Sequence, residues 1–517
     1  MLNDGQKPGG DRRDRRGTAV WPFVVIVLIA LAARWVAFRG FAASDDADYA
    51  RLAWACAQGQ VPPDELGAPP HYPTRLGVLL PVGGIFTIFG VHEWSLLVLP
   101  MLMSAASLAL AYVLGRVFFS HTAGLVAMLL YAVLPIDCQF ATWLLSDVPG
   151  AFWAGAGVLA VYLGSSVETT GRKVLAGAIA AVCFGVSWIT RTQVAQLAPF
   201  VAGALVIWIW RDRRNAWMAL TVAIGCLLVV GGEGLFYLRT KGDFLYNFHV
   251  AERMYAEHRQ WYFTEGGVYG WEPGRYAFGL ARRLLKMGPS EMFLNPNFAF
   301  IPLAALAAAL HVALWRRREF LFPAAWFLWA VVIFNFGSAS MKHYEPLPWI
   351  NAYLVPMQMP AVVLTGGWLT WMLSVSAGDK HLVRERRFWG GIAVAVIALG
   401  VAVGLHHHYR QGIGCRTARA AASELLQKSA DPLYTDGMTL RAIEFFSGYN
   451  LPRPVRDLRR LETESPPAGA AVFVNRDELQ RMNDQTGYTP PGCIDRPPAN
   501  WRIEKKWAGA EMYIVGP

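Results

Sequence analysis

Residues 93–115 read EWSLLVLPMLMSAASLALAYVLG, with a single charged side chain, Glu93, at the start of the run. An apolar stretch of about 20 residues is long enough to cross the roughly 30 Å hydrocarbon layer of a bilayer as a helix. Only a helix or a closed barrel satisfies its backbone hydrogen bonds in that layer. The stretch therefore predicts a membrane-spanning helix.

Further apolar runs of comparable length lie on both sides of this one. They occupy residues 20–38, 121–136, 147–164, 173–190, 193–210, 216–237, 298–315, 320–337, 350–374 and 388–405. Of the 517 residues, 54% are hydrophobic and 16% are charged, which is too apolar for an ordinary soluble enzyme. The predicted fold class is an all-α polytopic membrane bundle of about eleven transmembrane helices.

The basic residues predict how the bundle is oriented. The net charge is +10, but Lys and Arg form short clusters between the apolar runs instead of one continuous face, which argues against nucleic acid as a partner. With residues 1–19 as a disordered cytoplasmic tail, the clusters at 171–173, 211–214, 315–318 and 380–387 all fall on the cytoplasmic side, as expected for basic loops. The outer side then receives the loops 39–92 and 238–297 and the C-terminal end. We expect a multi-pass protein of a bacterial inner membrane.

The composition changes after residue 405. Helix-like and strand-like stretches alternate there, among them PLYTDG (432–437), TLRAIEFFSG (439–448), AAVFV (470–474) and AEMYIVG (510–516). This pattern predicts a small extracytoplasmic α/β domain over 406–517, after a transmembrane domain over 20–405. The stretch lacks a G-x-G-x-x-G phosphate loop, so we expect no nucleotide site in it.

Charged residues at the outer ends of the predicted spans are the candidates for chemistry. Asp45 and Asp46 begin a helix-like stretch in the first outer loop, and Asp147 stands at the start of a span. Each could be a helix-capping acid or a functional carboxylate that faces the bundle. Arg75 and Arg191, also at the outer boundary, are either interfacial cations or ligands of an anionic headgroup.

Several of these stretches resemble one known group of proteins. SDDADYARLAWACAQG (44–59) is similar to the first outer loop of the polyprenyl-phosphate-dependent glycosyltransferases of the GT-C fold, which include dolichyl-phosphate-mannose protein mannosyltransferases and bacterial aminoarabinose lipid A transferases. HYPTRLG (71–77) resembles the next element, and WLLSDVPGAFW (143–153) their second motif. The similarity covers approximately residues 20–210. In MKHYEPLPWINAYLVPMQMP (341–360), Ala352 stands where the family usually has Arg, and Lys342 or His343 could take its place.

The resemblance implies an inverting glycosyltransferase that moves a sugar from a polyprenyl-phosphate donor to a lipid, glycan or protein acceptor at the extracytoplasmic face. It assigns Asp45 as the base on the acceptor hydroxyl. Asp46 and Asp147 would orient the acceptor or hold a divalent cation, the one cofactor considered, with no metal ligands identified. Arg75, Lys342 and Arg191 would bind the donor phosphate.

A secondary transporter or lipid flippase is the alternative class. Such proteins usually have inverted repeats and ionisable residues near the membrane centre. The chain has no evident internal symmetry, and we expect almost no charge within the spans apart from Glu233. Convergence of the outer charged residues on one cavity would favour the enzyme.

Overall fold

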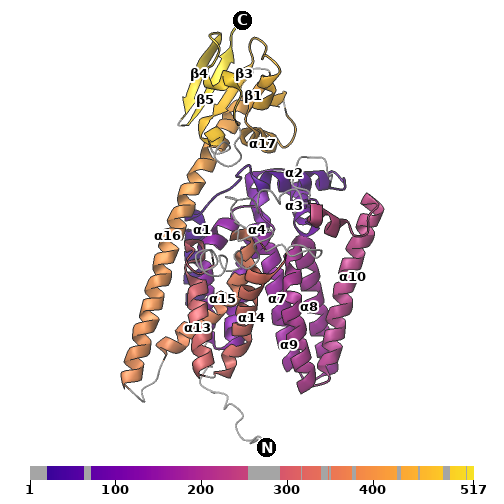
Figure 1. Ribbon diagram of the computed structural model, residues 1–517, viewed down its shortest axis with the longest axis vertical. Helices are drawn as coiled ribbons and strands as arrows, with labels where there is room; N and C mark the ends of the chain where they lie inside the picture. Colours follow the sequence, from indigo (N-terminus) through magenta and orange to yellow (C-terminus); the bar gives the residue numbers. More distant parts are fainter. Residues whose placement is uncertain are drawn as a thin grey trace, which may run out of the picture.

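The computed structural model describes residues 20–62, 71–253, 292–315, 317–338, 347, 351–374, 380–427, 432–451, 454–480, 489–507 and 509–517. Its helical part is a bundle with a smaller domain beyond one end (Figure 1). The bundle contains α1 (Trp21–Val36), α2 (Asp45–Ala57), α3 (Leu76–Phe89), α4 (Glu93–Phe118), α5 (His121–Ala132), α6 (Pro135–Phe140), α7 (Asp147–Ser166), α8 (Thr170–Thr190), η1 (Thr192–Leu197), α9 (Ala198–Arg211), α10 (Asn215–Lys241), η4 (Pro296–Phe298), α13 (Ile301–Trp315), η5 (Arg318–Phe320), α14 (Leu321–Phe336), α15 (Asn351–Leu373) and α16 (Lys380–Gln427).

Every predicted apolar run contains one of these helices, and the all-α membrane bundle is confirmed. Within the described ranges, 7 helical segments are long and apolar enough to cross a membrane: α4, α7, α8, η1 with α9, α10, η5 with α14, and α16. The apolar helices α1, α3, α5 and α13 are shorter. Helix length and composition therefore support most, but not all, of the predicted spans individually.

Small residues let neighbouring helices pack closely. A Cβ atom at Gly115 of α4 would lie 2.8 Å from Gly124 Cα of α5, and one at Gly124 would lie 2.6 Å from the carbonyl oxygen of Tyr112. Neither position has room for a side chain. Close contact through glycine is a common way for helices to associate in lipid, where van der Waals packing is the main attraction.

The predicted surface helix is present as α2, which lies across the end of the bundle that faces the small domain (Figure 1). The apolar piece predicted at 81–90 is part of α3. The loop before α2 also contacts the small domain, since the ring of Phe41 stacks on that of Phe445 with centroids 4.1 Å apart. Arg51 of α2 forms an ion pair with Glu444 of the small domain, so the surface helix itself contacts that domain as well.

The C-terminal domain begins later than residue 406. Helix α16 continues without a break from Lys380 to Gln427, and the first strand starts at Leu433. The domain contains β1 (Leu433–Thr435), α17 (Gly437–Phe446), β2 (Val455–Asp457), η6 (Leu458–Glu462), β3 (Ala471–Asn475), α19 (Gly492–Asp495), β4 (Trp501–Trp507) and β5 (Ala510–Val515). Its sheet has the order β2-β1-β3-β5-β4, with β1 parallel to β2 and β3, and β5 antiparallel to β3 and β4. The small α/β domain is confirmed.

The edge strands β2 and β4 have no counterpart in the predicted pattern. Strand β2 is only 3 residues long, and β4 has the sequence WRIEKKW, in which the residues from Arg502 to Lys506 are exposed. Pairing with a neighbour, not a buried alternating face, makes these segments strands.

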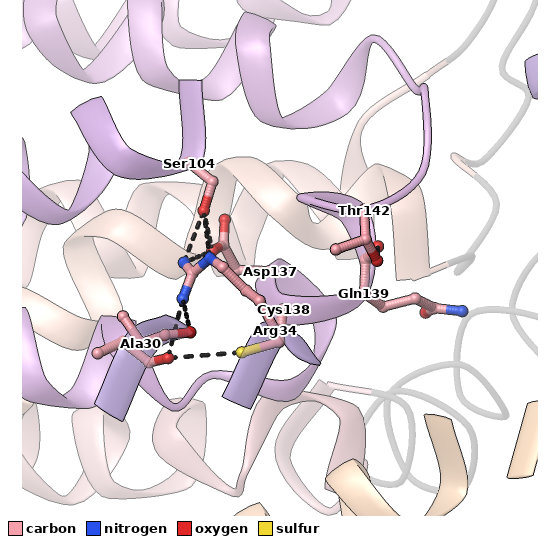
Figure 2. A network of polar contacts seen from close by, with 8 residues as sticks. Ala30, Arg34, Ser104, Asp137, Cys138, Gln139 and Thr142 are labelled. Atoms are coloured by element: carbon pink, nitrogen blue, oxygen red, sulfur yellow. Dashed lines mark hydrogen bonds and ion pairs between the residues drawn. The ribbon is translucent and has the colours of Figure 1, made fainter. Parts of the chain in front are cut away.

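A buried ion pair joins α1 to α6 and contacts Ser104 of α4, and its Arg34 is a charged group inside a predicted span in addition to Glu233. Arg34 lies in the last turn of α1, and its Nη2 is 2.5 Å from Asp137 Oδ2, with the two side chains 7% and 0% exposed. Ser104 Oγ donates to the same carboxylate oxygen at 2.7 Å (Figure 2). The cluster fixes α6, which leads into the loop that contains Ser146 and ends where α7 begins at Asp147.

Candidate active site

The first two residues of α2, Asp45 and Asp46, have different surroundings. Asp46 is fully buried, and its carboxylate accepts hydrogen bonds from the backbone N–H of Ala42 at 2.6 Å and of Ser44 at 2.9 Å. Between them, Ala43 has a φ of 56°, a left-handed conformation that residues other than glycine rarely adopt. Asp46 therefore holds a strained turn, and burial raises the pKa of its carboxyl. Asp45, the first residue of α2, is only half-buried.

Arg75 immediately precedes α3 and is fixed by two other segments. Its Nη1 donates to the Tyr49 hydroxyl of α2 and to Ser146 Oγ. Tyr49 stacks on Tyr72 with ring centroids 4.5 Å apart. Burial raises the pKa of Tyr49 to about 12, and burial together with the charge of Asp45 raises that of Tyr72 well above its ordinary value. Arg75 is thus a positioned cation and not a mobile interfacial one.

Asp147 forms an ion pair with Arg191 and does not cap its helix. It is the first residue of α7, whose N-terminus has no side-chain cap, and its Oδ1 is paired with Arg191 Nη1. Arg191 Nε donates to Gln193 Oε1 at 2.7 Å, and the guanidinium lies over the ring of Tyr353 at 5.0 Å from the centroid. The Asp147 carboxylate therefore orients a cation.

Ser146 connects the two arginines. Its Oγ accepts from Arg191 Nη1 at 3.3 Å and also from Arg75 Nη1. A Cβ atom at Gly77 would lie 3.0 Å from the Cα of Thr190, so α3 and the end of α8 approach as closely as a glycine allows. This contact brings Arg75 and Arg191, 116 positions apart in the sequence, to one place.

The arginines line a polar cavity that adjoins an apolar one. The polar cavity has a volume of about 70 Å³ and is lined by Arg75, Arg191, His71, Asn247 and Tyr353 among others. A second, apolar cavity of about 400 Å³ lies between α8, η1, α9 and α10. Trp188 lines both. Its indole N–H donates to Glu233 Oε2 at 2.5 Å, and Asn247 Nδ2 donates to Glu233 Oε1 at 3.1 Å, so a buried carboxylate holds the boundary between the cavities.

The predicted site residues thus divide into groups. Arg75, Arg191 and Asp147 come together, and Asp45 lies within electrostatic range of Asp147 and Tyr72. Asp46 is turned into its own loop. Lys342 and His343 lie outside the described residues. Ser146 was not predicted as a site residue, although it directly precedes Asp147 in the second motif, and Glu233 was noted only as a charge within a span.

A divalent cation finds few ligands here. Over the part of the chain that the structure describes, no group of three His, Cys, Asp or Glu side chains could hold a metal ion. Asp147 is paired with Arg191, and both oxygens of Asp46 accept backbone hydrogen bonds. The two acids that were expected to hold a cation, Asp46 and Asp147, therefore have other partners.

Comparison with known proteins finds one family match and several structures of similar fold. Residues 79–231 match the family described as dolichyl-phosphate-mannose-protein mannosyltransferase. No curated protein sequence matches the chain. Among solved structures, ArnT from Cupriavidus metallidurans bound to undecaprenyl phosphate is similar with a TM-score of 0.58 at 16% identity, over 96% of this chain and 100% of that one.

The apo form of the same ArnT has a TM-score of 0.54 at 17% identity, over 96% of this chain and 99% of that one. The oligosaccharyltransferase of Archaeoglobus fulgidus, tethered to an acceptor peptide, has a TM-score of 0.52 at 12% identity, over 97% of this chain and 74% of that one. These similarities show that the chain shares the GT-C fold of ArnT and the oligosaccharyltransferase, and the family match covers residues 79–231 of it.

Proposed function

We propose that the protein transfers a sugar from a polyprenyl-phosphate donor to a hydroxyl group of an acceptor at the extracytoplasmic face, with inversion at the anomeric carbon. The observation that supports this most is the junction of the two cavities. A cavity with two fixed guanidinium groups suits a phosphate, since Arg binds phosphate oxygens in a bidentate manner. The adjoining apolar cavity suits a prenyl chain.

Similar proteins support the choice of donor. The ArnT structure named above contains undecaprenyl phosphate, and the matched family uses dolichyl-phosphate mannose. The donor carries its own activated sugar phosphate, so the reaction needs no nucleotide site. Lys342, outside the described residues, is a third candidate for the donor phosphate.

In the proposed reaction Asp45 accepts the proton of the acceptor hydroxyl as its oxygen attacks the anomeric carbon. The bond from that carbon to the phosphate oxygen breaks, and the electron pair leaves with the lipid phosphate. Arg75 and Arg191 stabilise the charge that develops on the phosphate, because they are held in place before the reaction begins. Asp147 orients Arg191, and Asp46 holds the turn that presents Asp45.

The basic loops indicate how the bundle is oriented in the membrane. The cluster 211–214 and the start of α16 lie at the end of the bundle opposite the C-terminal domain (Figure 1). Basic loops prefer the cytoplasm. We infer that the C-terminal domain and the site are extracytoplasmic, in the inner membrane of a bacterium.

The function is tested with purified protein and a panel of polyprenyl-phosphate sugars, by measuring the release of lipid phosphate. We expect release from at least one donor, and a large decrease for Arg75→Ala and Asp45→Asn. Leu227→Ala, on the exposed surface of α10, serves as the control for substitution alone. Failure of every donor in the parent protein would contradict the proposal.

A further inference from the structure

A second polar cavity lies between the outer loop and the C-terminal domain. Its volume is about 380 Å³. One wall is formed by Ala43, Ser44 and Arg51, and the opposite wall by residues that follow β1, β2 and β3. Ser44 directly precedes Asp45, so the cavity borders the turn that carries the proposed base.

The sheet topology accounts for the position of this cavity. From β1 the chain crosses through α17 to β2 on one side, and from β2 it returns to β3 on the other side of β1. The connections after β1 and β3 therefore leave in opposite directions and open a crevice at the carboxyl ends of these strands. Ligands of open α/β sheets bind at such switch points. Asp436 after β1 and Glu478 after β3 both line the cavity.

The charges of the lining are balanced within the protein. Each of its three arginines has a carboxylate partner: Arg459 contacts Asp457 with Nε at 3.0 Å and Nη2 at 2.8 Å, Arg441 lies 3.6 Å from Asp48, and Arg51 is paired with Glu444. An anionic ligand would have to displace these carboxylates and would meet Asp436 and Glu478 as well. A neutral ligand with many hydroxyl groups can instead donate to carboxylates and accept from guanidinium groups.

We propose that this cavity is an acceptor subsite and that it binds neutral carbohydrate. The role as acceptor subsite rests on the proposed function, because it requires Asp45 to act on a hydroxyl that reaches from the cavity past Ser44. The lining of this cavity is polar, whereas the cavity between α8 and α10 is apolar. The acceptor and the prenyl chain of the donor would therefore bind in different cavities. The bound part of the acceptor is therefore its glycan, whether the glycan is free or joined to a lipid.

Two glycines provide a matched pair of variants. Gly437 is the first residue of α17, and a Cβ atom there would meet only Asp457 Oδ2, at 3.9 Å. Gly437→Phe therefore places a ring in the cavity without a backbone clash. Gly492 is the first residue of α19 in the same domain, does not line the cavity, and has nothing within 4 Å of an added Cβ atom. Gly492→Phe is the control.

Saturation-transfer NMR measures binding of neutral gluco-, galacto- and manno-oligosaccharides to the full-length protein in detergent. We expect at least one oligosaccharide to bind the parent and Gly492→Phe equally, and to bind Gly437→Phe about tenfold or more weakly, which corresponds to a loss of about 1.4 kcal/mol. Inorganic phosphate should not compete. Absence of binding to the parent, equal binding to both variants, or displacement by phosphate would overturn the inference.

Transfer assays separate this inference from the proposed function. With a donor that the parent uses, Gly437→Phe should raise the KM for the oligosaccharide and leave acceptor-independent release of lipid phosphate unchanged. The same oligosaccharide joined to a lipid shows which form of the glycan is preferred. If no donor is ever used while oligosaccharide binding still depends on Gly437, the proposed reaction is wrong and the carbohydrate site remains.

Discussion

Replacing Arg34 by Leu should destabilise the bundle far more than replacing Arg34 and Asp137 together. Arg34 makes hydrogen bonds to Ser104, to the carbonyl oxygens of Ala30 and Ala132, and to Asp137. Its removal leaves a buried carboxylate without its cation, which typically costs about 3–5 kcal/mol. That cost corresponds to an increase of about 10²-fold to about 4,000-fold in the unfolding equilibrium constant. In the double variant no buried charge remains, so the cost should fall to within about 1 kcal/mol of the parent.

The assay is reversible unfolding in mixed detergent micelles with increasing SDS, followed by far-UV circular dichroism. Arg317→Leu is the control, since Arg317 and Glu319 form an exposed pair, 50% and 45% exposed, and such pairs contribute about 0–1 kcal/mol. The double variant is Arg34→Leu with Asp137→Leu, and Asp137→Leu is also measured alone. A loss of stability in the double variant equal to the sum of the two single losses would refute the reasoning, because it would mean that the side chains stabilise the bundle through packing and not as a pair. A single loss as small as that of the control would refute it too.

Other predictions concern the site and the outer domain. Asp45→Asn should fold and bind donor but transfer sugar about 100- to 10,000-fold more slowly, and transfer within about twofold of the parent would exclude Asp45 as the base. Arg75→Ala should weaken donor binding more than acceptor binding, with partial recovery in Arg75→Lys, and unchanged donor affinity would remove it from the phosphate site. Burial raises the pKa of Asp48 from 3.8 to about 6, so the folded chain binds an extra proton between these pH values. Thermal stability should therefore fall as the pH rises through this window, and Asp48→Asn should reduce that fall. A stability profile that Asp48→Asn leaves unchanged would contradict this. Alkaline phosphatase should be active when fused after Pro517 and inactive after Arg214, and the reverse would invert the proposed orientation.

More of the fold than of the candidate site could be predicted from the sequence. Apolar run length is a local property, so a helix lies in each predicted run, and short strand-like stretches were sufficient to predict β1, β3 and β5. The end of α16 could not be predicted, because the helix continues to Gln427 through residues that are no longer apolar, where apolar run length gives no signal. Motif positions led to the prediction of Asp45, Arg75 and Asp147 as site residues. The pattern could not assign Asp46 to its own loop, because that depends on a turn geometry that neighbouring acids do not reveal.

The sequence by itself determined which segments lie in the bilayer and which lie in water. The apolar runs lie in the bilayer, and the region after them lies in water. That follows from transfer free energy, which is a sum over neighbouring residues. The tertiary structure alone decided which polar groups meet, because the contacts of Arg75 with Ser146, of Arg191 with Asp147, and of the outer loop with the C-terminal domain depend on how helices pack. Close approach at Gly77 and the crossing of the chain between β1 and β3 created the two polar cavities, and neither leaves a periodic signal in the residues that line them.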